Sequence, residues 1–223
     1  MAGRLEVGRA MRIVGQRIKL TKAHMELMGI PRRFWNVHFD EIPECEGKVY
    51  LRSYMRDIET MLDRGVGLLL WGANGHGKTS AAIIAAMEAR RRGASVLFAQ
   101  AETLRQAVIE KTMFSTDKTL VERAREVDFL VLDDLGKEHR GESAFSERFF
   151  ENLLRERCAQ KRVTFITTNL PISTTGKSGE PSLRNRYIAS MLEVMREAMY
   201  PVHLKAHNWR DRAQEDMAAR LTG

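Results

Sequence analysis

From residue 29 onward, the pattern of apolar and polar positions changes repeatedly between two periods. Short, nearly continuous apolar runs occur at "GLLLW" (67–71), "SVLFA" (95–99), "DFLVLD" (128–133), "VTFITT" (163–168) and "YPVHL" (200–204). Such runs are typical of strands buried on both faces. Between them lie helical segments at residues 78–92, a pair across 101–126 interrupted near "FSTDKT", 143–160 and about 182–197. This alternation predicts an α/β fold with a five-stranded parallel sheet flanked by helices.

One segment illustrates the helical period. Phe145, Phe149 and Leu153 recur every four residues, which predicts a single stripe facing the core. Gly93 ends the helix before the second strand, and "STTGKSGEPS" (173–182) has the composition of a loop. In a parallel sheet of this kind ligands bind at the carboxyl ends of the strands.

Composition excludes several classes of protein. With 43% hydrophobic and 29% charged residues, the chain resembles an ordinary globular protein. It has no apolar run of the roughly 18 residues needed to cross a bilayer, and the N-terminus lacks the apolar block of a signal peptide. We therefore expect a cytoplasmic protein without a membrane segment. Cys45 and Cys158 are isolated, which favours reduced thiols over a zinc site.

The net charge of +7 favours a polyanionic partner. Residues 1–28 carry much of the excess, and we interpret them as a short basic helical arm; its cations are Arg4, Arg9, Arg12, Arg17, Lys19 and Lys22. Two interpretations of this arm stay open: a solvated helix that packs on the main domain, or a contact surface for nucleic acid or a protein partner.

The motif "GANGHGKT" (72–79) matches GxxxxGK[ST], directly after a predicted strand and before a predicted helix. Its glycines let backbone N–H groups approach phosphate oxygens, and the helix adds its positive dipole end. Lys78 would reach the β- and γ-phosphates, and the Thr79 hydroxyl would ligate Mg²⁺. His76 is interpreted as filling a loop position, without a catalytic role. The predicted nucleotide-binding residues are Gly72, Ala73, Asn74, Gly75, His76, Gly77, Lys78, Thr79 and Ser80.

Two adjacent aspartates end the strand "FLVLDD". In a P-loop protein, an Asp at such a strand end supplies the second Mg²⁺ contact, usually through water, and Asp133 fits this role. Asp134 can orient or deprotonate an attacking water, or it can cap the turn that follows.

Asn169 follows the strand "FITT", which we expect to lie beside both the P-loop strand and Asp133. Its amide can hydrogen-bond a γ-phosphate or the attacking water, and Thr167 and Thr168 are alternatives. A polar residue there favours hydrolysis over transfer. A small-molecule kinase would instead need an acceptor pocket and a lid, and no lid is recognisable.

Five segments in this order resemble the DnaC/DnaI/IstB group of AAA+ ATPases, which comprises replicative-helicase loaders and ATPase helpers of transposases: "GIPRRFWNVHF" (29–39), "GLLLWGANGHGKT", "FLVLDDLGKE", "FITTNLP" and "HNWR" (207–210). The resemblance extends over about residues 29–212. It implies three parts: the arm (1–28), an AAA+ ATPase domain (29–212) without a large C-terminal lid domain, and a tail (213–223).

The resemblance also implies roles for individual residues. Residues 72–79 become Walker A, Asp133 and Asp134 Walker B, and Asn169 sensor 1. Many AAA+ proteins have glutamate in place of Asp134, so the shorter side chain implies slow hydrolysis. Arg210 resembles sensor 2, with Arg212 as the alternative, and Ile30 or Phe34 would lie near adenine.

One departure concerns the arginine finger. Members of the group commonly have a Ser-Arg pair where this chain has Ser190 and Met191. Arg186 is the preferred substitute, with Arg184 and Arg196 as alternatives. If none substitutes, hydrolysis is very slow or needs another protein's arginine, because a finger contributes about 10³–10⁵ in rate.

The resemblance implies an ATP- and Mg²⁺-dependent switch that forms a homo-oligomer on ATP binding and loads a replicative DNA helicase onto single-stranded DNA. The alternative is an IstB-type transposase helper acting on duplex DNA. A P-loop kinase or an inactive binding module is a less favoured interpretation. DNA contact could involve Arg105, Lys111, Phe114 and Lys118, or these residues could belong to an ordinary solvated face and core.

Overall fold

The computed structural model describes residues 17–109, 119–137, 143–173 and 181–205, together with Ala218, Ala219 and Leu221. Within these residues a five-stranded sheet has the order β2-β3-β4-β1-β5, and every neighbouring pair is parallel. Its strands are β1 (Gly67–Trp71), β2 (Val96–Gln100), β3 (Phe129–Leu135), β4 (Val163–Thr168) and β5 (Met199–His203). The predicted five-stranded parallel sheet is confirmed. Pro201, which has no N–H to donate, lies on the edge strand β5, where a missing backbone hydrogen bond is tolerated.

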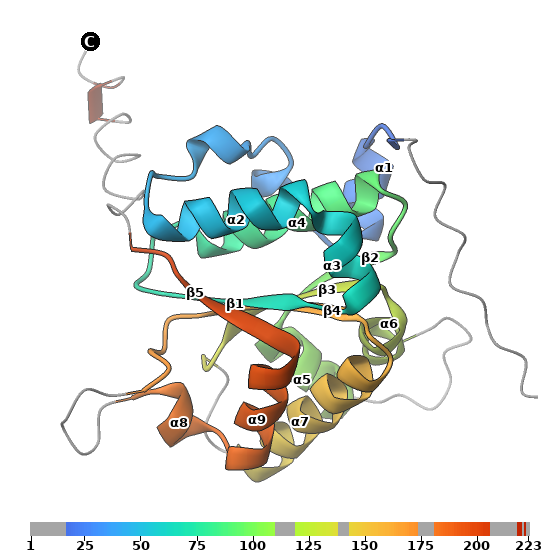
Figure 1. The fold of residues 1–223 in the computed structure, drawn as a ribbon, viewed down its shortest axis with the longest axis vertical. Coiled ribbons are helices and arrows are strands. Elements are labelled where there is room, and N and C mark those ends of the chain that lie inside the picture. The colour runs from blue at the N-terminus through green and yellow to red at the C-terminus, as the bar shows by residue number, and fades with distance from the viewer. Residues whose placement is uncertain are drawn as a thin grey trace, which may run out of the picture.

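Helices cover both faces of the sheet (Figure 1). One layer contains α1 (Lys22–Leu27), α2 (Glu46–Arg56), α3 (Ile58–Arg64) and α4 (Lys78–Arg91). The other contains α5 (Ala101–Ile109), α6 (Leu120–Glu126), α7 (Ser143–Ala159), α8 (Leu183–Arg186) and α9 (Ala189–Ala198). Side chains alternate along the strands, so that Leu68 and Leu70 enter the first core and Leu69 the second.

The single helix predicted over 182–197 is wrong: the structure has two helices, α8 and α9, separated by extended backbone at Tyr187 and Ile188. Tyr187 is buried in the second core, and so is Met191 one turn into α9. The break lets Tyr187 enter the core from an extended segment.

The described part of the N-terminal segment packs on the α/β core. Met25 and Met28 are buried in the first core cluster, and the Phe98 N–H of β2 donates to the Met28 carbonyl at 2.7 Å. Arg17 forms an ion pair with Glu88 of α4. Residues 1–16, which include Arg4, Arg9 and Arg12 of the predicted arm, lie outside the described residues.

Arg157 of α7 is fully buried, and its hydrogen bonds within the described residues go to carbonyl and hydroxyl oxygens. Its guanidinium donates to the carbonyl oxygens of Ala124 (2.7 Å), Val127 (2.9 Å) and Val163 (2.6 Å) and to Thr164 Oγ1 (2.8 Å). The acceptors belong to the C-terminal end of α6 and the start of β4, so one side chain joins α6, α7 and the sheet. Burial lowers the pKa of Arg157 to about 9, which leaves it charged at neutral pH.

No helix within the described ranges is both long and apolar enough to cross a membrane.

Candidate nucleotide-binding site

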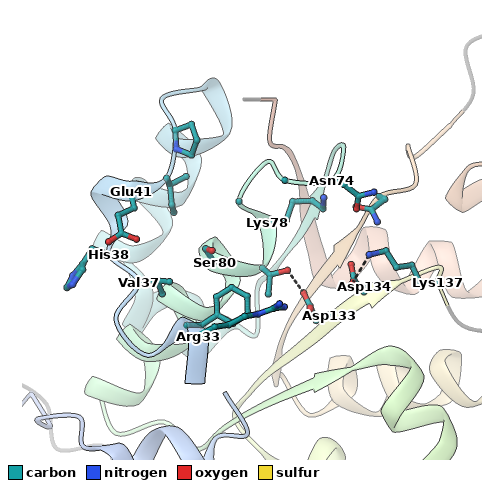
Figure 2. Close-up of a pocket in the computed structure, with 17 residues that line it drawn as sticks. Arg33, Val37, His38, Glu41, Asn74, Lys78, Ser80, Asp133, Asp134 and Lys137 are labelled. Atoms are coloured by element: carbon teal, nitrogen blue, oxygen red, sulfur yellow. Dashed lines mark hydrogen bonds and ion pairs between the residues drawn. The ribbon is translucent and has the colours of Figure 1, made fainter. Parts of the chain in front are cut away.

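A cavity of about 400 Å³ lies at the carboxyl ends of β1, β3 and β4, between the loop that precedes α4 and the segment 33–43 (Figure 2). β4 lies between β1 and β3 in the sheet, as the placement of Asn169 requires. The polar lining of the cavity includes Asn74, Lys78, Thr79, Ser80, Asp133, Asp134, Lys137 and Asn169.

The loop 72–77 has the backbone that its glycines permit. Gly75 and Gly77 have φ of 80°, in the left-handed region. A Cβ on Gly72 would lie 2.4 Å from the Leu204 carbonyl oxygen, so no larger residue fits there. The Lys78 ammonium donates to the carbonyl oxygens of Gly72 (2.9 Å) and Ala73 (2.7 Å). The loop therefore curves around its own lysine.

His76 does not line the cavity and contacts the segment after β5 instead. Its Nδ1 is 2.9 Å from the Leu204 carbonyl oxygen, and the Leu204 N–H donates to the Trp71 carbonyl at 2.9 Å. Trp71 and His203 stack at 3.8 Å between ring centroids. His76 thus fastens the loop to the end of β5, a role that the sequence interpretation of a loop filler missed.

Asp133 is buried, and its Oδ1 accepts hydrogen bonds from Thr79 Oγ1 at 2.9 Å and Thr167 Oγ1 at 2.6 Å. Burial is the main cause that raises the pKa of Asp133, and the charge of Asp134 adds to it, while the two hydroxyls oppose the shift. A buried carboxylate beside a threonine hydroxyl provides the hard oxygen ligands that Mg²⁺ prefers. The residues present fit a magnesium ion.

Asp134 occupies an irregular part of β3. Its φ is 59°, and the pairing of β3 with β4 is shifted between Leu132 and Leu135. Its N–H donates to Thr167 Oγ1 at 2.9 Å, and its Oδ2 accepts from Lys137 Nζ at 2.9 Å. Figure 2 shows this ion pair at the wall of the cavity. Strained backbone of this kind is concentrated at functional sites.

Asn169 follows β4 directly. Its Oδ1 is buried and has no hydrogen-bond partner among the described residues. Thr168, by contrast, is satisfied within the protein, since its hydroxyl donates to the Leu135 carbonyl at 2.7 Å. A buried polar atom without a partner is rare and marks a place for a water molecule or a ligand.

The wall opposite the strand ends comes from the segment around η1 (Arg32–Phe34) and η2 (Phe39–Glu41). Its cavity-lining residues are Arg33, Phe34, Val37, His38, Glu41, Ile42 and Pro43. The Arg33 guanidinium lies 4.6 Å from the Phe34 ring centroid. Of the two apolar neighbours considered for adenine, Phe34 lines the cavity, whereas Ile30 is buried in the core.

Other predicted residues lie elsewhere. Arg186 belongs to α8 and does not line the cavity. Met191, at the position of the expected finger, is fully buried in the second core. Arg105 pairs with Glu102 at 2.7 Å. Five further candidates lie outside the described residues: Arg210, Arg212, Lys111, Phe114 and Lys118.

Sequence reasoning missed several residues of the site. Lys137 had a signal, since it lies three residues after Asp134 in "DDLGKE", but the pairing depends on the local turn. Thr167 was considered only as an alternative to Asn169, and the structure places its hydroxyl between the two aspartates. Val37 and His38 belong to the segment "GIPRRFWNVHF" but were not predicted to line the cavity, and Glu41 lies outside that segment.

Comparisons with known proteins agree with this geometry. The DnaI crystal structure is similar to this chain with a TM-score of 0.65 and 22% identity, over 84% of this chain and all of that one. The DnaC helicase loader gives a TM-score of 0.60 and 21% identity, over 78% of this chain and all of that one. Replication initiator DnaA bound to AMPPCP and single-stranded DNA gives 0.55 and 18%, over 78% of this chain and 51% of that one.

Similarity at these identities shows the fold alone, that of an α/β P-loop NTPase. A search of curated protein sequences gives no match. The family model of the IstB-like ATP binding proteins matches residues 53–197, which is more than half of the chain and includes the phosphate-binding loop, both aspartates and Asn169. The chain belongs to the family of IstB-like ATP binding proteins.

Proposed function

We propose that this protein is an ATP-hydrolysing AAA+ switch that loads a replicative helicase onto single-stranded DNA. The observation that carries the ATPase part is the convergence of Lys78, Thr79, Asp133 and Asn169 on one cavity from three different strand ends. A P-loop next to a buried acid and an unpartnered amide is the arrangement expected for phosphoryl chemistry on water.

The residues of the phosphate end divide the work. The loop N–H groups and Lys78 bind the phosphates, while Thr79 and Asp133 hold Mg²⁺. Bound Mg²⁺ neutralises charge on the phosphate oxygens. Because Asp133 is buried and already accepts two hydroxyl hydrogen bonds, its orientation is fixed before the ion arrives.

Asp134 and Asn169 act on the attacking water. Both line the cavity beside the loop, and Asn169 has a buried oxygen with no partner in the described chain. Asp134 orients the water and accepts its proton. Arg210 would add the sensor 2 contact from the segment after β5.

Arg186 remains the proposed arginine finger, and it would act in the site of a neighbouring subunit. The burial of Met191 supports a finger from a different position, since a residue there could not reach another chain without leaving the core. We therefore propose a homo-oligomer that forms on ATP binding.

The helicase-loading role is supported by similarity to DnaI and to the DnaC helicase loader. Single-stranded DNA as a ligand is supported by the similarity to DnaA bound to such DNA and by the net charge of +7. An IstB-type helper of transposition on duplex DNA is the second candidate, favoured by the family model.

Mass photometry of the purified protein tests this proposal. The conditions are no nucleotide, ADP·Mg²⁺, and ATP·Mg²⁺ with Asp134→Asn, each with single-stranded DNA, duplex DNA or none. The loader predicts assembly only with ATP and preferentially on single strands, and co-purification with a helicase is then the next experiment. Long assemblies on duplex would favour the transposition helper. A monomer under every condition would overturn the switch.

A further inference from the structure

We propose that Lys137 is a positioning residue that holds the Asp134 carboxylate when the site contains no triphosphate and moves to the γ-phosphate when one binds. The exchange frees Asp134 only in the ATP-bound state. This inference rests on the proposed ATPase function and assigns to Lys137 a role that links occupancy of the site to the activity of its base.

Local geometry places the two side chains together. The Lys137 N–H approaches the Asp134 carbonyl at 3.3 Å, which closes a tight turn, and its Nζ lies 2.9 Å from Asp134 Oδ2. Gly136 has φ of 99°, and a Cβ there would lie 2.6 Å from Leu170 Cδ1. The turn is therefore packed against the residue that follows Asn169. Lys137 and Asp134 both line the cavity with Lys78 and Thr79.

The ion pair is well suited to exchange because it is partly exposed. The side chain of Lys137 is 48% exposed and that of Asp134 is 32% exposed, and ion pairs with this access to water contribute little to stability. A γ-phosphate oxygen is a stronger acceptor for the Lys137 ammonium group than the Asp134 carboxylate is. The γ-phosphate carries more negative charge and would lie where less water reaches.

Charge determines the direction of the exchange. A triphosphate adds several negative charges beside Asp134, which repel its carboxylate and attract Lys137. A diphosphate lacks the γ-phosphate, so Lys137 stays with Asp134. The Lys137–Asp134 ion pair thereby distinguishes ATP from ADP, because Asp134 stays paired with Lys137 until a triphosphate is bound.

The double-mutant cycle of Lys137→Met and Asp134→Asn, measured by calorimetric binding of ADP and of non-hydrolysable AMPPCP, tests the exchange without activity. We expect Lys137→Met to weaken AMPPCP about tenfold, from the loss of one charge-assisted hydrogen bond, and ADP less than twofold. Asp134→Asn should tighten AMPPCP, because Lys137 no longer has to leave a carboxylate. In the double variant this gain should fall to the part that comes from relief of the repulsion between Asp134 and the triphosphate. Lys137→Arg should restore most of the AMPPCP affinity.

Arg33→Met is the charge control, since it removes a cavity-lining cation at the opposite wall and should affect the two nucleotides alike. Equal weakening of both nucleotides by Lys137→Met would overturn the exchange. An Asp134→Asn gain of undiminished size in the Lys137→Met background would also overturn it, because repulsion alone would then explain the whole gain. If the wild-type protein binds neither nucleotide, the proposed ATPase function fails instead.

Discussion

The buried polar groups at the two ends of the parallel sheet differ in how fully they are hydrogen-bonded. At the amino end, Arg157 donates to four carbonyls and a hydroxyl, and Asp128 accepts from both the N–H and the hydroxyl of Ser95 at 2.9 and 2.8 Å. At the carboxyl end, Asn169 Oδ1 has no partner in the described chain, Asp134 has a positive φ, and burial raises the pKa of Asp133.

This difference separates stability from function. A satisfied buried network fixes the positions of α6, α7 and the strands, and nothing in it remains available for a ligand. At the end where ligands of parallel sheets bind, Asn169 Oδ1 and the strained Asp134 both line the cavity. The amino end also has a strained residue, Lys161 with φ of 51°, and a buried atom without a hydrogen bond in the described chain, Arg125 Nε, but neither residue lines the cavity. We therefore expect substitutions at the amino end to change folding alone, and substitutions at the carboxyl end to change nucleotide chemistry with little loss of stability.

The largest effect should come from Arg157→Met. It leaves several buried carbonyl groups without a donor, and each such group costs about 1–3 kcal/mol, so we expect a loss of about 3–5 kcal/mol in the free energy of unfolding. Urea denaturation measures it. The control is Arg155→Met on the same helix, whose exposed ion pair with Glu151 should contribute less than about 1 kcal/mol. Equal losses in the two variants would mean that the buried hydrogen bonds of Arg157 contribute no more to stability than an exposed ion pair. The distinction between the two ends of the sheet would then not hold.

Asn169→Leu should have the opposite profile. It removes an amide whose oxygen is buried without a partner in the described chain, so the free energy of unfolding should stay the same or rise. Hydrolysis should fall about 10²-fold, as for the loss of a preorganised polar group at a reacting centre. Single-turnover hydrolysis and thermal denaturation together measure this contrast. A clear loss of stability would show that Asn169 belongs to the structural set of polar residues.

The Asp133→Asn substitution should change the free energy of unfolding in a way that depends on pH. The raised pKa means that the folded protein disfavours the ionised carboxylate, so without Mg²⁺ the Asn variant should be the more stable protein at neutral pH. As pH falls, Asp133 becomes protonated, and the difference should disappear once the pH is below the ordinary value of 3.8. Denaturation in EDTA across pH measures it. A wild-type protein that is more stable than the variant at neutral pH would contradict the sign.

The smallest effect should come from His76→Ala. The loss of one hydrogen bond to Leu204, about 0.5–1.5 kcal/mol, should loosen the loop and weaken ADP and AMPPCP binding by about 2- to 10-fold. Fluorescence titration measures it. His24→Ala, which removes a capping contact of α1 away from the cavity, should leave both affinities unchanged. Unchanged binding in His76→Ala as well would show that the loop holds its shape without β5.

The sequence predicts the sheet and the wall of the cavity that the P-loop and the strand ends form, because both depend on local patterns. Apolar runs mark each strand, and the glycines of the P-loop determine its backbone wherever it occurs. The wall formed by Phe34, Val37 and Ile42 depends instead on how a segment before β1 packs across the sheet, which no local period encodes. The break at Tyr187 was missed because its residues satisfy a helical pattern that tertiary packing overrides.

Arg157 shows the same limit in another form. An arginine in the amphipathic helix α7 is expected to face water. The burial of Arg157 is possible only because carbonyls from α6 and β4 lie close enough to accept its hydrogen bonds. No pattern in α7 itself indicates those acceptors.

The stacked rings of Trp71 and His203 give the molecule an intrinsic optical signal. Burial, with the nearby charges of Lys205 and His76, lowers the pKa of His203, so its ring stays neutral at neutral pH and becomes a cation only in more acidic solution. A cationic imidazole in contact with an indole quenches its emission, whereas a neutral one does so weakly. Because His76 of the loop contacts Leu204 beside this strand end, we expect the emission of Trp71 at constant pH to change when nucleotide enters the cavity. Such a change would allow the protein to be titrated with unlabelled nucleotide.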